Sequence, residues 1–123
     1  MKNFPKKTMV CVTVQKTCEQ LIMEGAKRSL GGGLYVVHVA RNGHKLLGAG
    51  TEAEALEYLF RSAQQYGAEM NMLRSNDVVE TIIGFARRNA VECIVMGKAG
   101  ADKRTALPES IRKMLPEVQL VIV

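Results

Sequence analysis

The sequence predicts an α/β domain with a five-stranded, parallel, open sheet and helices on both faces. Apolar runs of strand length alternate along the chain with amphipathic segments of helix length. Capping residues or glycines flank most of the helical segments, and no linker or low-complexity stretch interrupts the order. Such alternation requires parallel strands joined by right-handed crossovers. The 123 residues suit one domain, residues 1–123, of which 1–6 are expected to form a flexible tail.

In the first half of the chain, strands are expected over residues 8–14 (TMVCVTV) and 34–40 (LYVVHVA). Thr17 with Gln20 and Thr51 with Glu54 have the spacing of capping boxes, so a helix should follow each strand. The expected buried faces of these helices are Leu21, Met23, Ala26 and Leu30 in the first, and Leu56, Leu59, Phe60 and Ala63 in the second. The glycines at 31–33 and Gly67 should end them.

In the second half, a weaker strand is expected over residues 69–73, and buried strands over 92–96 (ECIVM) and 119–123 (QLVIV). Asp77 and Glu80 predict a third capping box. The helix after it should bury Val79, Ile82, Ile83 and Ala86 and place Arg87 and Arg88 in its last turn. Pro108 suits the first turn of a last helix over residues 108–115.

Composition narrows the classes of protein. The formal charge is +5, with 12 acidic residues interleaved among 17 basic ones, and no dense basic stripe contains aromatic residues, so nucleic acid is not an expected partner. No stretch is long enough to span a membrane and no signal-peptide pattern occurs. Three cysteines without metal-ligand spacing fit buried thiols in a reducing compartment, and the expected location is the cytoplasm.

A ligand of such a sheet binds outside the carboxyl ends of the strands, where the winding reverses. Two segments meet that condition, residues 13–17 and residues 97–110. Gly97 and Gly100 would let backbone approach a ligand closely, and the helix start that follows favours anions. Cations and a hydroxyl that suit a phosphate are supplied there by Lys98, Lys103, Arg104, Ser110, Arg112 and Lys113. A flexible loop with a solvated charged face explains the same residues without a ligand.

No residue set predicts a catalytic or metal centre. His38 lies inside an apolar strand, where a core histidine hydrogen-bonded to backbone is expected more often than a ligand contact. Ser110 is the serine of the candidate site, but no base can be paired with it. The two histidines have no carboxylate or thiol cluster beside them. The chain is therefore not expected to be an enzyme.

The chain resembles the universal stress protein domain over nearly its whole length. The resemblance is carried by MVCVTV, YVVHVA, DVVETIIGFARRNAVECIVMGKAG and the ending IRKMLPEVQLVIV. Among such domains it is most similar to the one in Kdp potassium-sensor histidine kinases, where the first strand ends in a hydroxyl-rich segment, as Thr13 and Thr17 do here. The resemblance implies an adenine nucleotide alpha hydrolase-like fold and a regulatory, non-catalytic role in stress responses.

The resemblance also implies an adenine-nucleotide site, with ATP as the usual ligand, across the first and fourth strands. Gly97 and Gly100 match the first half of the family motif, Gly-x2-Gly followed nine residues later by Gly-Ser or Gly-Thr. The second half departs from the motif, because Glu109 precedes Ser110 where glycine is usual. Thr13 stands where nucleotide-binding members usually carry aspartate. The expected binding residues are Thr13, Val14, Gln15, His38, Val39, Met96, Gly97, Lys98, Gly100, Lys103, Arg104, Ser110 and Ile111.

Alternatives remain open at this point. The sensor-kinase branch implies a cyclic dinucleotide near Thr13, Gln15 and His38. A ligand-free interaction domain would use the basic loop against an acidic protein surface, and slow nucleotide hydrolysis would need Asp102 or Glu109. The last strand is expected to form a homodimer interface through Leu120, Val121, Ile122 and Val123, as universal stress proteins commonly do. A protein partner in signalling is also expected.

Overall fold

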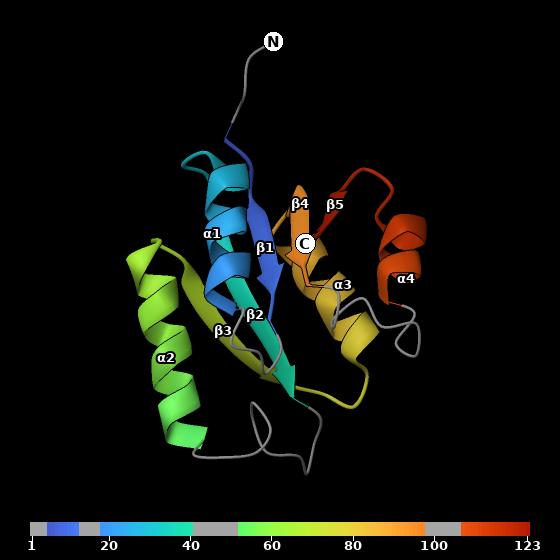
Figure 1. Cartoon of the computed structure of the whole chain (residues 1–123). Helices are drawn as coiled ribbons and strands as arrows, with labels where there is room; N and C mark the ends of the chain where they lie inside the picture. Colours follow the sequence, from blue (N-terminus) through green and yellow to red (C-terminus); the bar gives the residue numbers. More distant parts are fainter. Residues whose placement is uncertain (1–4, 13–17, 41–51, 98–106) are drawn as a thin grey trace.

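A computed structural model describes residues 5–12, 18–40, 52–97 and 107–123 of the chain (Figure 1). The elements in chain order are β1 (Thr8–Cys11), α1 (Cys18–Ser29), β2 (Leu34–Ala40), α2 (Glu52–Gln65), β3 (Glu69–Arg74), α3 (Val78–Arg88), β4 (Cys93–Met96), α4 (Leu107–Met114) and β5 (Gln119–Ile122). The predicted order of strands and helices is confirmed. Most boundaries lie within one residue of the prediction. The first strand is shorter, since β1 ends at Cys11 and residues 13 and 14 lie outside the described part.

The strands form one parallel sheet in the order β3-β2-β1-β4-β5. The chain winds outward from β1 through β2 to β3, and then from β4 to β5 on the other side. The winding therefore reverses between β1 and β4, the two central strands. Pairing of β1 with β2 continues one residue beyond the strand, because the Val12 amide donates to the Val37 carbonyl at 3.0 Å.

Alternation of side chains along the strands divides the core into two layers. One layer contains Val10, Val36 and Val95 under Leu21 and Ile22 of α1 and Leu59 and Ala63 of α2. The other contains Met9, Val37 and Ile94 under Ile82, Ile83 and Phe85 of α3 and Leu107 and Ile111 of α4. Figure 1 shows the two pairs of helices on opposite sides of the sheet. Strands covered in this way explain the nearly continuous apolar runs of the sequence.

Three expected core residues of α1 and α2 are instead exposed. Met23 is 38% exposed, Leu30 is 45% exposed and Phe60 is 50% exposed. The buried faces use smaller side chains instead, including Gly25 and Ser29 of α1 and Ser62 of α2. Leu21, Ala26, Leu59 and Ala63 belong to the packed faces as predicted. The three exposed residues each lie one position beyond a buried residue, because apolar side chains continue past the edge of each contact face.

The start of α3 confirms half of its predicted capping box. The Asp77 carboxylate accepts a hydrogen bond from the Glu80 amide at 3.0 Å, as an N-cap should. The Asp77 amide donates to the Ser75 hydroxyl at 3.0 Å rather than to the Glu80 side chain. Arg87 and Arg88 lie in the last turn, as predicted. The capping boxes at Thr17 and Thr51 lie outside the described residues.

Candidate functional site

The candidate site is the edge of the sheet at the carboxyl ends of β1 and β4. These strands are neighbours, and Cys11 at the end of β1 pairs with Met96 at the end of β4. The chain continues from β1 toward α1 on one face and from β4 toward α4 on the other. The place where connections diverge in this way is the usual ligand site of an open α/β sheet.

Gly97, the first residue after β4, is a glycine that the fold does not require. A Cβ atom built there would meet Leu21 Cδ1 at 3.4 Å and Cδ2 at 3.6 Å, which are ordinary contact distances. Among the described glycines, Gly31 and Gly67 are the ones with positive φ, so the backbone conformation of Gly97 is one that any residue can adopt. Neither packing against the described residues nor conformation therefore accounts for glycine here. A close approach by a ligand would account for it.

His38 is buried and tied to the end of β1. Its Nδ1 atom lies 2.9 Å from the Val12 carbonyl oxygen, and the side chain is 6% exposed. A carbonyl oxygen only accepts, so Nδ1 must carry the proton. The interpretation of His38 as a core histidine bonded to backbone is thus confirmed. The bond joins β2 to the last described residue before the segment 13–17.

The residues expected to bind from the α3–α4 side are mostly core residues. The side chains of Met96 and Ile111 are fully buried in that layer, and Val39 packs against it. Any contribution of these three residues to binding must therefore come from the backbone. Ser110 of α4 is half-buried, and Glu109 beside it is exposed in the first turn of the helix.

The structure therefore places only some of the predicted site residues at the carboxyl edge. His38 of β2 and Gly97, which follows β4, both lie at the carboxyl edge, and β1 stands between their strands. The remaining predicted contacts lie outside the described residues, namely Thr13, Val14, Gln15, Lys98, Gly100, Lys103 and Arg104. The structure adds Leu21 and Val12, which the sequence analysis did not assign to the site. Leu21 was expected only as a core residue, and no sequence signal indicated that it faces Gly97.

Cys11 and Cys93 are poorly suited to nucleophilic chemistry. Burial raises the pKa of the Cys11 thiol to about 12 and also raises the pKa of the Cys93 thiol. Both thiols are free and buried, so they remain protonated at neutral pH. Within the described ranges, no group of three His, Cys, Asp or Glu side chains could hold a metal ion.

Comparison with solved structures identifies the fold. A universal stress family protein from Burkholderia pseudomallei superposes with a TM-score of 0.64 at 13% identity, covering 96% of each chain. The fold is that of the universal stress proteins. The universal stress protein from Archaeoglobus fulgidus in complex with dAMP gives 0.62 at 18% identity, covering 98% of both chains. A universal stress protein in complex with cAMP gives 0.63 at 11% identity, covering 98% of this chain and 96% of that one.

No protein-family model matches the chain, and no curated protein is similar to it in sequence. At identities below one fifth, the structural match establishes the universal stress protein fold and leaves the ligand to be argued from the site. None of the helices within the described residues is long and apolar enough to cross a membrane.

Proposed function

We propose that the chain is a regulatory module of the universal stress protein type that binds an adenine nucleotide at the carboxyl ends of β1 and β4. The observation that carries the proposal is Gly97, which lies at the point where the winding reverses and for which the fold gives no reason. Two proteins of the same fold have dAMP or cAMP bound, so an adenine nucleotide is the ligand class to test first.

Glu109 favours a ligand with few phosphates. Its exposed carboxylate stabilises the start of α4 through the helix dipole, but it would repel a phosphate chain approaching that helix start. The family resemblance implies ATP, which carries more negative charge than AMP or cAMP. We therefore expect a monophosphate to bind at least as tightly as ATP.

Calorimetric titration of AMP, cAMP and Mg-ATP into the folded protein tests this function. The Gly97→Ala variant should fold normally, since its methyl group meets only ordinary contacts, yet bind about tenfold more weakly because backbone approach is blocked. Gly84→Ala on α3 is the matched control and should bind as the wild type does. No heat with any of the three nucleotides up to millimolar concentration would exclude the proposal. Heat with a cyclic dinucleotide alone would favour the sensor-kinase alternative.

We also propose that the module forms a homodimer through β5. The two edges of the sheet differ in polarity, because β3 presents Glu69, Asn71 and Arg74, whereas β5 presents an apolar run. Ile122 and Val123 are 38% and 45% exposed. An edge strand that is apolar and exposed is a template for pairing, whereas charged edges prevent it.

Sedimentation velocity over a range of concentrations tests the dimer. Ile122→Lys should shift the protein toward monomer without unfolding it, because the wild-type side chain is exposed. Asn71→Lys on the opposite edge is the control and should leave the dimer intact. Wild-type protein that remains monomeric at tens of micromolar would exclude this interface.

A further inference from the structure

Most described basic residues lie at one edge of the molecule, the edge where the strands begin. The helices run against the parallel strands, so the last turns of α1, α3 and α4 end there (Figure 1). This amino edge consists of Lys6, Lys7, Lys27, Arg28, Arg87, Arg88, Arg112 and Lys113. Elsewhere in the described residues, Arg61 pairs with Glu57 on α2, and Arg74 lies at the carboxyl end of β3.

Hydrogen bonds show that the amino edge is one continuous surface. The Lys6 amide donates to the Ser29 carbonyl at the end of α1, at 2.9 Å. The Glu92 amide donates to the Lys7 carbonyl at 2.7 Å, and the Gln119 amide donates to the Glu92 carbonyl at 3.0 Å. The backbone is therefore linked across the edge from α1 to the start of β5.

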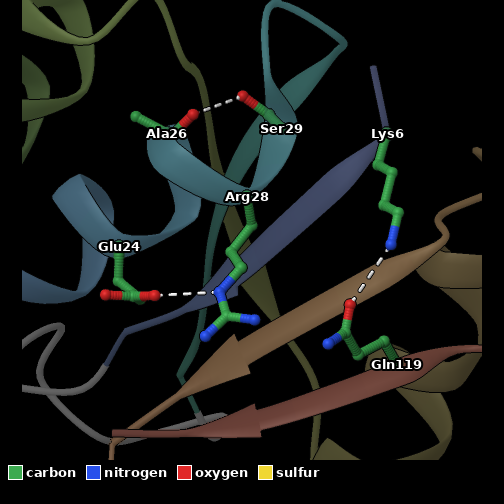
Figure 2. A network of polar contacts seen from close by, with 6 residues as sticks. All are labelled: Lys6, Glu24, Ala26, Arg28, Ser29 and Gln119. Carbon is green, nitrogen blue, oxygen red and sulfur yellow. Dashed lines mark hydrogen bonds and ion pairs between the residues drawn. The ribbon is translucent and has the colours of Figure 1, made fainter. Parts of the chain in front are cut away.

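Another hydrogen bond links the helix ends on the other face of the sheet. The Arg87 guanidinium donates to the Met114 carbonyl at 3.4 Å and so connects the ends of α3 and α4. Figure 2 shows the α1 side, where the Lys6 ammonium reaches the Gln119 side chain at 3.4 Å over β4 and β5.

The positive charge of this surface is only partly neutralised. Glu24 pairs with Arg28 at 2.9 Å (Figure 2), and the Glu92 carboxylate accepts from the Lys7 amide at 3.1 Å. Glu69 and Glu117 are the other described acidic residues at this edge. Exposed cations that form no ion pair with a described residue are Lys7, Lys27, Arg87, Arg88, Arg112 and Lys113. The helix dipoles explain why basic residues sit in last turns, but their convergence on one edge also creates a positive field there.

Two exposed apolar side chains stand among these cations. Leu30 follows α1 with a φ of 49° and is 45% exposed, and Met114 ends α4 and is 48% exposed. A leucine with left-handed backbone angles is strained, and in the free protein the half-exposed Leu30 side chain gains little stabilisation from burial to offset that strain. Burial against a partner would supply that energy.

We propose that the amino edge binds an acidic protein segment that also carries apolar side chains. Acidic groups complement the exposed lysines and arginines, and apolar groups cover Leu30 and Met114. Nucleic acid fits less well, because the large exposed aromatics of the described residues, Tyr58 and Phe60, lie on α2 away from this edge. A membrane fits less well, since Leu30, just after α1, and Met114, at the end of α4, lie on opposite faces of the sheet and form no continuous apolar face.

Fluorescence anisotropy with a labelled peptide of glutamate and leucine tests the proposal on the whole chain. Binding should weaken as salt rises and should fall about tenfold or more in the double variant Lys27→Glu with Lys113→Glu. Arg74→Glu, at the opposite edge, is the control matched in charge to Lys27→Glu alone and should change binding little. Should the charge-reversed helix ends destabilise the fold, Lys27→Gln with Lys113→Gln removes the charges without reversing them.

Three outcomes would overturn the proposal. The first is no binding of the peptide at low salt by folded wild-type protein. The second is an equal loss of binding in Arg74→Glu and in the amino-edge variants, which would indicate net charge alone. The third is equally tight binding of single-stranded DNA or of anionic vesicles with the same response to the variants. None of these outcomes depends on nucleotide binding at the opposite edge.

Discussion

Replacement of Gly25 by alanine would test how closely α1 packs on the sheet. A Cβ atom at position 25 would lie 2.3 Å from Val10 Cγ2 and 3.2 Å from Leu34 Cδ1. Carbon atoms in contact are normally about 3.5–4.0 Å apart, so α1 would have to move outward by about 1 Å or Val10 would have to leave its rotamer. Val10 is fully buried in the α1–α2 layer, which leaves it little room to yield.

The magnitude follows from two opposing effects. Overpacking a buried site costs about 1–3 kcal/mol, whereas alanine in place of glycine within a helix gains about 1 kcal/mol. We expect Gly25→Ala to lower the free energy of unfolding by up to about 2 kcal/mol, measured by urea denaturation followed by circular dichroism. Gly84→Ala is the control with opposite sign, because the only described atom within 4 Å of its Cβ, apart from the backbone of its own helix, is the far end of Arg88 at 3.3 Å.

A double-mutant cycle would identify the contact responsible. Val10→Ala removes Cγ2, so the double variant should lose less stability than the two single losses together predict. If Gly25→Ala is as stable as Gly84→Ala, or if the two losses simply add, the close contact between α1 and β1 is not the cause.

Three further predictions concern single side chains. The folded-state pKa of Cys11, about 12, lies above its ordinary value of 9.0, so the unfolded chain loses its thiol proton first as pH rises. The stabilisation by the protonated thiol is complete well below pH 9 and is lost above it. From about pH 8 to pH 10, urea titrations should show a loss of about 1.4 kcal/mol in the free energy of unfolding that Cys11→Ala lacks. His38→Leu leaves the buried Val12 carbonyl without its donor and should cost about 1–3 kcal/mol; a neutral result in thermal unfolding would refute the bond's importance. Asp77→Ala removes the α3 N-cap and should cost about 0.5–2 kcal/mol, while Asp77→Asn should keep most of the stability.

The alternation of elements was predictable because strand and helix periods differ and because each helix carries local start or stop signals. Asp77 and the buried run 93–96 are examples, since each can be interpreted from its immediate neighbours. The contact faces of α1 and α2 were less predictable. Phe60 is large and apolar at helical spacing, yet it is 50% exposed, because the sheet accommodates Leu59 and Ala63 instead.

The candidate site was predictable in position and only in part by residue. Gly97 follows a buried strand, and that is sufficient to place it at the carboxyl edge of a parallel sheet. Met96 precedes Gly97 and Ile111 follows Ser110 in the sequence, but the side chains of Met96 and Ile111 are in the core. Adjacency in sequence does not tell on which side of the backbone a side chain lies.

The sequence by itself determined the class of fold and the order of elements, because these follow from periodicity and capping within short segments. It also determined that Gly97 would follow a buried strand. Only the tertiary structure decided that Gly97 faces Leu21 without needing to be glycine, and that His38 Nδ1 meets the Val12 carbonyl. It also brought the basic ends of three helices and the lysines before β1 to one edge. These relations join residues far apart in the chain, and they depend on strand order and register, which no local pattern encodes.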